Sequence, residues 1–228
     1  MSHYHDTSLN VLGLLDPGIE LNPIERTAIE QANRQIGVGF DNVLFWNLRY
    51  SRFRERGSGF GSRGENLAYK RDLLKREGVE DAASVLDFGC GDLEVVKVLN
   101  LKSYVGIDSS ESALDLARTA RPDWTFQRMT IGNDDAAILP PQDFVLCFEV
   151  LIHQPSSEAY HRVVKRLADC TLRTLLVSGY DHDRDVSSSN HMVFFYEPLE
   201  VSLQRTGRFS TVRRIGAHTS VSIFRCDV

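Results

Sequence analysis

The 228-residue sequence contains no apolar run that approaches the roughly 18 residues a membrane-spanning helix requires. Its N-terminus lacks a basic region followed by an apolar stretch, so no secretory signal is predicted. None of its four cysteines form a Cys-x-x-Cys pair, which argues against a zinc site and against a redox pair. These absences predict a cytoplasmic protein in a reducing compartment, with no membrane span and no metal ligand set.

The chain also lacks the positive charge of a general polyanion binder. Its formal net charge is -5 and its pI is about 5.8. The charges are unevenly distributed. Most of the charged residues in 1–48 are acidic, whereas residues 49–76 carry an excess of arginine and lysine. This basic segment is compatible with a local anion site, or with a solvated helix face followed by a basic loop.

The N-terminal part of the chain reads as helical. Asn22-Pro23 is typical of an N-cap followed by proline in the first helical turn, and it predicts a helix to about Gln35. Aromatic residues and arginines are interleaved over residues 40–55, and a glycine-rich loop follows them. Such a mixture of side chains can stack on bases or bind a phosphate or an acidic sugar.

A second helix is predicted after this loop. Residues 62–65, Ser-Arg-Gly-Glu, have the spacing of a capping box. The helix that they begin is expected to stop at Gly78, with Leu67, Leu73 and Leu74 facing inward. We therefore expect residues 1–79 to form a helical extension with a covering loop, and residues 80–228 to form the main domain.

From residue 84 onward, short apolar strands alternate with amphipathic helices. Helices are expected around Leu93–Leu99, after the second strand, from Ser156, and around Phe194–Arg205. This alternation predicts a doubly wound, mostly parallel sheet with right-handed crossovers. The predicted strands are 84–88, 104–107, 124–128, 144–148, 172–178, 210–215 and 220–225.

The most specific motif of the chain is a glycine turn that follows the first of these strands. It reads Asp87-Phe88-Gly89-Cys90-Gly91, and a turn of this kind lets the backbone approach a ligand closely. A dinucleotide fingerprint would need a third glycine where Glu94 stands. Acids near this turn would repel a pyrophosphate but tolerate a cationic cofactor.

A carboxylate at the end of the second strand supports the same interpretation. Asp108 ends the segment Tyr104-Val105-Gly106-Ile107-Asp108. In an open α/β sheet, ligands bind at the carboxyl ends of the strands, where this side chain can accept both ribose hydroxyl groups.

These two motifs resemble the first and second motifs of class I S-adenosylmethionine-dependent methyltransferases. The resemblance implies a Rossmann-like α/β fold with a seven-stranded, mostly parallel sheet whose last strand is antiparallel. It also implies that Asp87 and the Gly89–Gly91 backbone hold the methionine part of S-adenosylmethionine, whereas Asp108 holds the ribose. The expected cofactor contacts are Arg63, Asp87, Gly89, Cys90, Gly91, Asp108, Ser109, Met129, Phe148 and Glu149.

One departure from the family concerns adenine. Many members carry an acid after the third strand, whereas this chain has Arg128-Met129-Thr130 there, so Met129 is expected only to pack on the ring. A second resemblance, over residues 46–70, is to bacterial methyltransferases that occur with surface-polysaccharide enzymes. It implies that the glycine loop covers the cofactor and that Arg63 reaches its carboxylate, for which a guanidinium is well suited.

Three residues are candidates for catalysis. His153 follows the fourth strand, in a segment similar to the family stretch that walls the methionine end of the cofactor. It is expected to act as a general base or to orient the acceptor, although a loop histidine that caps the next helix would look the same. His191 and Asp181, after the fifth strand, could form a base and its orienting partner, or belong to a solvated loop.

The sequence thus predicts an enzyme that methylates a small molecule or sugar at oxygen, and anionic acceptors are among the candidates. Methylation of RNA or a nucleotide is the first alternative, if the arginines of residues 49–63 form a continuous surface stripe. Nucleic acid is otherwise disfavoured, because Phe148-Glu149-Val150-Leu151 stands where amine-directed enzymes carry an Asn/Asp-Pro-Pro-aromatic sequence. The second alternative is a non-catalytic partner protein that binds the cofactor without turnover.

Overall fold

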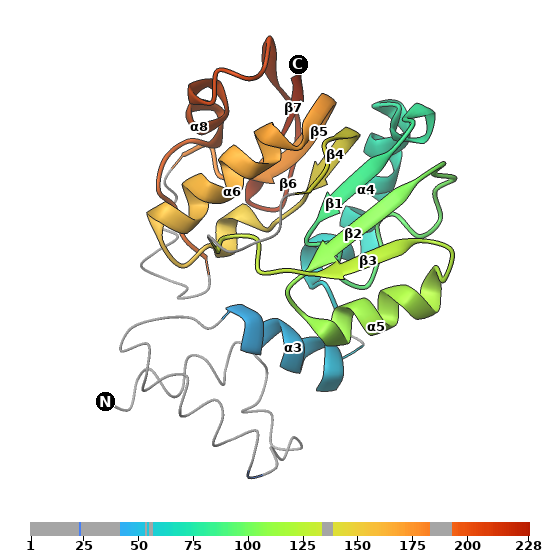
Figure 1. The fold of residues 1–228 in the computed structure, drawn as a ribbon. Helices are drawn as coiled ribbons and strands as arrows, with labels where there is room; N and C mark the ends of the chain where they lie inside the picture. Colours follow the sequence, from blue (N-terminus) through green and yellow to red (C-terminus); the bar gives the residue numbers. More distant parts are fainter. Residues whose placement is uncertain (1–22, 24–41, 53, 55–56, 134–138, 183–192) are drawn as a thin grey trace.

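The computed structural model describes residues 23, 42–52, 54, 57–133, 139–182 and 193–228. Their strands form one seven-stranded sheet of order β3-β2-β1-β4-β5-β7-β6 (Figure 1). Strands β1 to β5 are parallel, whereas β7 is antiparallel to both of its neighbours. This confirms the expected Rossmann-like sheet with an antiparallel last strand. The strands are β1 (Val85–Phe88), β2 (Tyr104–Asp108), β3 (Thr125–Arg128), β4 (Gln142–Cys147), β5 (Thr171–Gly179), β6 (Thr211–His218) and β7 (Val221–Asp227).

Helices cover both faces of this sheet. Helices α6 and α8 share one apolar cluster with the strands, whereas α4 and α5 share another (Figure 1). Helix α3 packs against α5 beside the sheet. The α-helices are α3 (Asn42–Arg52), α4 (Gly64–Arg76), α5 (Glu111–Ala120), α6 (Ser157–Asp169) and α8 (Leu199–Arg205), and the short 3₁₀ helices are η1 (Phe60–Ser62), η2 (Val79–Asp81) and η3 (Leu151–His153).

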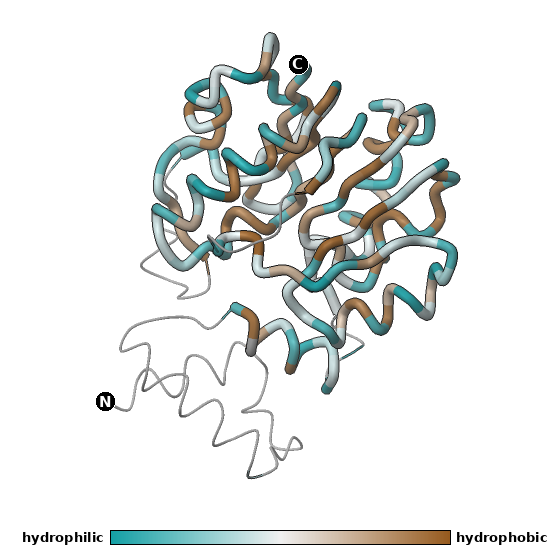
Figure 2. The backbone as a smooth tube through the Cα atoms, in the orientation of Figure 1, coloured by the Kyte–Doolittle hydropathy of each residue, from teal (hydrophilic) through white to brown (hydrophobic). Residues whose placement is uncertain are grey.

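Strand β4 shows how the sequence builds a core on two sides of the sheet. Val145 and Cys147 pack in the cluster with α6, whereas Phe144 and Leu146 pack in the cluster with α4 and α5. Successive side chains of a strand point to opposite faces, so an uninterrupted apolar run fits a strand that is covered on both sides. Figure 2 shows this concentration of hydrophobic residues in the central strands, while the helices carry hydrophilic residues on one side.

Serine side chains begin two of the helices. The Oγ atoms of Ser110 and Ser156 accept hydrogen bonds from the third residues of α5 and α6, Ala113 and Ala159, at 3.2 Å each. They satisfy backbone donors that have no partner within a helix. The apolar stripe predicted for α6 is buried at all four positions, Tyr160, Val163, Val164 and Leu167.

Two helical predictions were wrong. Residues 91–99 form a series of turns, because Gly91 and Leu93 adopt φ of 54° and 62°, which interrupts a right-handed helix. The helix expected around Phe194–Arg205 begins only at Leu199. Its N-cap is Pro198, and a proline disfavours the helical conformation of the residue before it.

The predicted capping box is also wrong. Helix α4 has Arg63 as its N-cap residue, without a side-chain capping bond. The hydroxyl of Ser62 instead accepts a hydrogen bond of 3.3 Å from Nζ of Lys70, which is buried on the inner side of α4. The helix nevertheless begins beside the expected residues and is followed by Gly78, which is left-handed at φ 79°.

The helix predicted from Pro23 to about Gln35 lies outside the described residues, apart from Pro23, so it stays a prediction. The division of the chain at residues 79 and 80 is likewise a sequence-based expectation. Within the described parts of the chain, no helix has the length and apolar character that crossing a membrane requires.

Replacing Ser156 with alanine is expected to lower the free energy of unfolding by about 1 kcal/mol, because the first turn of α6 loses its capping acceptor. Urea unfolding followed by circular dichroism measures this change. Ser103→Ala, at an exposed position before β2, is the matched control and should leave stability within about 0.5 kcal/mol. Equal stability of both variants would show that the Ser156 cap does not contribute.

Candidate active site

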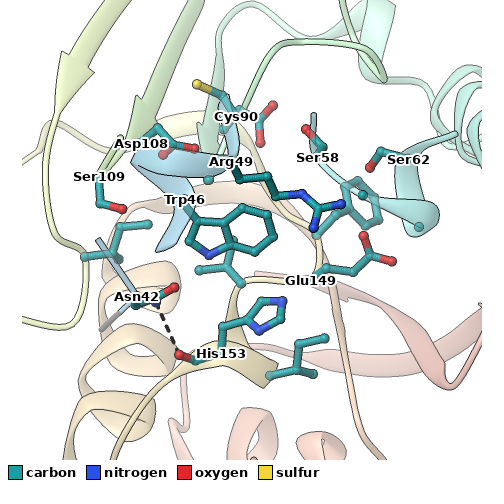
Figure 3. A pocket seen from close by; sticks show the side chains of 18 of the residues that line it. Asn42, Trp46, Arg49, Ser58, Ser62, Cys90, Asp108, Ser109, Glu149 and His153 are labelled. Carbon is teal, nitrogen blue, oxygen red and sulfur yellow. Dashed lines mark hydrogen bonds between the residues drawn. The ribbon is translucent and has the colours of Figure 1, made fainter. Parts of the chain in front are cut away.

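A cavity of about 430 Å³ lies where the carboxyl ends of β1, β2 and β4 meet helix α3. Its volume is within the usual range of small-molecule sites, and its position is the ligand edge of an open α/β sheet. Figure 3 shows side chains from the strand ends and from α3 pointing toward one another around it. The walls combine apolar side chains with the carboxylates of Asp87, Asp108, Glu94 and Glu149.

Asp108 ends β2 and is held by backbone N–H groups. Its Oδ2 accepts a hydrogen bond of 2.9 Å from Gly91 N, and its Oδ1 accepts one of 2.9 Å from Ser110 N. Burial raises the pKa of this carboxyl to about 6, although the backbone hydrogen bonds act in the opposite direction. The neighbouring Ser109 also lines the cavity.

Asp87 stands one strand away, near the end of β1. Its Oδ2 accepts a hydrogen bond of 2.8 Å from the Tyr104 hydroxyl. Burial raises the pKa of Asp87 to about 7, and repulsion from Asp108 adds to the rise, whereas the tyrosine and the positive charge of Lys70 oppose it. A buried carboxylate with this pKa favours a positively charged ligand, which would replace the hydration that burial removed.

The glycine turn requires glycine on steric grounds at both positions. Gly89 has φ 76°, and a Cβ there would lie 2.2 Å from Cγ2 of Val150. Gly91 has φ 54°, and a Cβ there would lie 2.5 Å from the hydroxyl oxygens of Tyr50 and Ser58. These close approaches let the turn reach the floor of the cavity beneath the loop that precedes α4.

The amide groups of this turn are used within the protein. The N–H groups of Gly89 and Cys90 donate to the carbonyl of Ile107, at 2.7 and 3.0 Å, and that of Gly91 donates to Asp108. The N–H groups of Gly89, Cys90 and Gly91 are therefore occupied, which disfavours an anionic ligand such as a pyrophosphate at this turn.

Glu149 follows β4 and takes part in a buried polar cluster. Its backbone is left-handed, at φ 61°, and its N–H donates nothing outward because it is bonded to Ser178 Oγ at 2.8 Å. Its Oε2 accepts a hydrogen bond of 3.0 Å from Lys70 Nζ. Its Oε1 lies 3.4 Å from Nε2 of His218, without a hydrogen bond between them.

Helix α3 supplies the opposite wall. The Trp46 ring meets His153 edge-on at 5.3 Å between centroids, and Asn42 Nδ2 donates a 3.2 Å hydrogen bond to the His153 carbonyl (Figure 3). The Arg49 guanidinium lies 5.6 Å from the Trp46 ring centroid, and its Nε donates to the carbonyl of Gly57 at 2.7 Å. His153, a predicted catalytic residue, is thus placed in the cavity wall by packing against α3.

Arg63 occupies a different position from the one expected. Its Nη2 forms an ion pair of 2.6 Å with Oδ2 of Asp92, and it is not among the residues that line the cavity. Asp92 also accepts a hydrogen bond of 2.7 Å from Ser58 Oγ, which itself pairs with the Tyr50 hydroxyl at 2.8 Å. Arg63 therefore ties the glycine loop to the turn after β1, while Arg49 is the guanidinium in the cavity wall.

The remaining predicted site residues divide into two groups. Cys90 and Phe148 line the cavity, together with Asp87, Gly89, Asp108, Ser109, Glu149 and His153. Gly91 does not line the cavity, but its N–H group donates a hydrogen bond to Asp108, which does. Met129 is buried in the apolar cluster beneath α6, and its neighbours Thr130 and Ile131 line the cavity instead.

The structure does not bring Asp181 to the cavity. One of its oxygens pairs with Nδ1 of His182 at 2.6 Å, and the other accepts a 2.7 Å hydrogen bond from Ser222 Oγ. Burial alone would raise the pKa of Asp181, but these two hydrogen bonds and the charge of Arg214 outweigh it and lower the pKa. His191, its expected partner, lies outside the described residues.

Sequence reasoning missed the roles of Lys70 and Trp46 in this site. A signal for Lys70 was present, because it lies three and four residues before the inward-facing Leu73 and Leu74, on the buried side of α4. The aromatic and arginine-rich segment predicts an anion or base site. Its pattern does not indicate that Trp46 contacts His153, which lies 107 positions further along the chain.

Comparisons with known proteins agree with this geometry. A family model described as a methyltransferase domain matches residues 62–192, more than half of the chain. The chain therefore belongs to this methyltransferase family. No curated protein sequence matches it significantly.

Two of the similar solved structures match almost their whole length. The magnesium protoporphyrin IX methyltransferase of Synechocystis, with bound S-adenosylhomocysteine, has a TM-score of 0.56 and 18% identity, covering 89% of this chain and 95% of that one. The N-methyltransferase NodS of Bradyrhizobium japonicum, in complex with the same product, has a TM-score of 0.62 and 12% identity, covering 80% and 97%. Likeness at this identity establishes the fold.

Family and fold together define a class I S-adenosylmethionine-dependent methyltransferase, an enzyme whose cofactor is S-adenosylmethionine. The cavity suits this cofactor, because the buried carboxylates of Asp87 and Asp108 line it. Carboxylates of this kind can compensate the ammonium and sulfonium charges and accept hydrogen bonds from ribose hydroxyl groups.

Cofactor affinity is expected to increase with pH. Asp87 has a pKa of about 7 in the free protein, and a cationic ligand favours its ionised form, so a proton must leave when the ligand binds below that pH. Calorimetric titration with S-adenosylmethionine should therefore give an affinity about tenfold weaker at pH 6 than at pH 8, as expected for one coupled proton. Asp87→Asn should flatten this dependence, and an affinity independent of pH in the unmodified protein would contradict the assignment.

Proposed function

We propose that this enzyme transfers the methyl group of S-adenosylmethionine to an oxygen atom of a small-molecule or glycan acceptor. The observation that carries the proposal is the position of His153, in the wall of the cofactor cavity and against Trp46. A hydroxyl acceptor must lose a proton during transfer, and a histidine in the cavity wall is suited to receive it.

The cofactor is proposed to lie along the strand ends. Asp108 and Ser109 would hold its ribose, whereas Asp87, Glu149 and the backbone of the glycine turn would hold its methionine part. The support is the order of the strands, because Asp108 ends β2, Asp87 lies near the end of the adjacent β1, and Glu149 follows β4 on the other side of β1. Adenine would then reach toward Thr130 and Ile131, beyond β3.

The chemistry asks little of the protein beyond alignment. The bound cofactor supplies an electrophilic methyl group on a sulfonium. The protein has to place the acceptor oxygen in line with that group and exclude water, and alignment of this kind is worth about 7–11 kcal/mol. Trp46 and Val150 provide apolar walls beside His153 for this purpose.

An anionic acceptor is supported by Arg49. Its guanidinium lies in the wall formed by α3, near Trp46, and a guanidinium can bind a carboxylate or phosphate with two parallel hydrogen bonds. The resemblance of residues 46–70 to polysaccharide-associated methyltransferases is compatible with an acidic sugar as the acceptor. Residues 1–79 are proposed as the extension that covers the site, since α3 and the glycine loop both border the cavity.

Nucleic acid is less well supported as an acceptor. A continuous arginine stripe over residues 49–63 would favour it, but Arg49 borders the cavity and Arg63 is paired with Asp92. Of the described arginines in this segment, only Arg52 and Arg54 are exposed.

A cytoplasmic location is proposed as well, and the four cysteines support it, because all are free and buried.

The acceptor class can be tested by a screen that measures S-adenosylhomocysteine release. We expect turnover with hydroxylated small molecules, above all acidic sugars and phenols, and no turnover with matched amines or with short RNA. Methylated products identified by mass spectrometry and O-demethylation chemistry would locate the new bond. Turnover restricted to amines or RNA would overturn the proposal.

His153→Ala is expected to lower kcat by about 100-fold or more, as for loss of a general base, while cofactor affinity changes less than twofold. The two quantities separate because His153 borders the cavity at the acceptor side rather than at Asp87 or Asp108. His161→Ala, on α6 and paired with Glu197, is the control. Unchanged kcat in His153→Ala would return His153 to a purely structural role.

A further inference from the structure

Lys70 is a fully buried lysine that contacts residues lining the candidate cofactor site. Its relative exposure is 0%, and it projects from α4 beside the buried Leu73 and Leu74. Nζ donates to Ser62 Oγ at 3.3 Å and to Glu149 Oε2 at 3.0 Å, and it lies 5.5 Å from the Phe148 ring centroid. Burying an ammonium group is costly unless it is paired, so this position calls for a reason.

The charges around Lys70 do not balance. Glu149 pairs with it directly, and Asp87 is close enough for each to influence the ionisation of the other. His218 adds no charge, because burial and the nearby Lys70 lower its pKa to about 4. Tyr104 faces Asp87 with a neutral hydroxyl.

Three further groups face Asp87 from neighbouring elements. Asp108 repels it from β2, while Cys90 and Cys147 carry buried thiols whose pKa is raised by burial, so they remain neutral. Backbone N–H groups compensate Asp108. Asp87 and Glu149 share the cation of Lys70, so these two carboxylates lack one positive charge.

We propose that Lys70 is a positioning residue that fixes Glu149 and leaves the Asp87–Glu149 pair short of a single positive charge, which the ammonium group of the cofactor's methionine part supplies. The proposal rests on the assignment of Asp87 and Glu149 to the methionine end made above. Its consequence is that Lys70 sets both the strength and the pH range of cofactor binding, without touching the cofactor.

The geometry gives Glu149 little freedom to turn elsewhere. Its backbone is left-handed and its N–H is bonded to Ser178. Its carboxylate lies so close to Gly61 that a Cβ there would be 2.0 Å from Oε1. With Oε2 held by Lys70, the carboxylate is confined between α4 and the glycine loop at the border of the cavity.

The competing explanation is that Lys70 and Glu149 form an ion pair with a structural role alone, and it predicts different effects of substitution. Replacing both partners of a buried pair by uncharged residues is often neutral or stabilising. The neighbours of Lys70 on α4 are leucines, so methionine at this position would suit the packing. Stability and cofactor binding should therefore respond differently to substitutions in the pair.

The test compares Lys70→Met with Lys75→Met, the same change at an exposed lysine on the same helix. Each purified protein is titrated with S-adenosylmethionine by calorimetry between pH 6 and pH 9, and its Tm is recorded at each pH. Lys70 lowers the pKa of Asp87, so without this cation Asp87 is expected to hold its proton to higher pH. We expect Lys70→Met to bind about tenfold more weakly than Lys75→Met at pH 6, as for a displacement of one pH unit. The difference in affinity should narrow toward pH 8, where the ammonium group of the cofactor is still partly charged.

Two additional variants separate charge from packing. Lys70→Arg keeps the cation and should show the pH profile of the unmodified protein. The double variant Lys70→Met/Glu149→Gln should regain the Tm lost by Lys70→Met but bind weakly at every pH. A loss of affinity in Lys70→Met that is equal at all pH values, or affinity restored in the double variant, would overturn the proposal.

Failure of the underlying assignment would look different. If Asp87→Asn and Glu149→Gln both bound S-adenosylmethionine as tightly as the unmodified protein, the methionine end would lie elsewhere, whatever Lys70 does. If these two variants lost affinity while Lys70→Met matched Lys75→Met, the assignment would stand and only the role of Lys70 would be refuted.

Discussion

The burial of carboxylates at the ends of adjacent parallel strands is the constraint on which the rest of this site depends. Asp87 and Asp108 end neighbouring strands and lie out of solvent, so their charged forms need partners. Backbone N–H groups provide these for Asp108, whereas Asp87 has the Tyr104 hydroxyl and the field of Lys70. The raised pKa of both groups shows that this compensation is incomplete, and a cationic cofactor would complete it.

The covering segments follow from the same constraint. A low-dielectric site strengthens charge interactions only where water is kept out. Helix α3 closes one side through Trp46 and Asn42, and the glycine loop closes another through the Ser58–Asp92–Arg63 contacts. Both segments precede β1 in sequence, so residues distant from the strand ends complete the walls of the cavity.

Much of the fold and half of the site could be predicted because they depend on local patterns. The apolar strands, the serine caps of α5 and α6 and the turn glycines each express a short-range rule. The failures arose where tertiary contacts override such rules. Leu93 adopts a left-handed conformation, which is incompatible with the helix predicted around Leu93–Leu99. Ser62 accepts a hydrogen bond from Lys70 instead of capping α4. Arg63 pairs with Asp92 and fastens the glycine loop to the turn after β1, so its contact with the cofactor stays a prediction.

By itself, the sequence determined the class of the enzyme and its cofactor, because the strand ends, the glycine turn and the acids beside them lie within a few residues of one another. Only the tertiary structure decided which distant side chains complete the cavity. Lys70 meets Glu149 across 79 positions and Trp46 meets His153 across an even longer separation. Contacts of this kind follow from how helices close over a sheet, and no local pattern of residues encodes that closure.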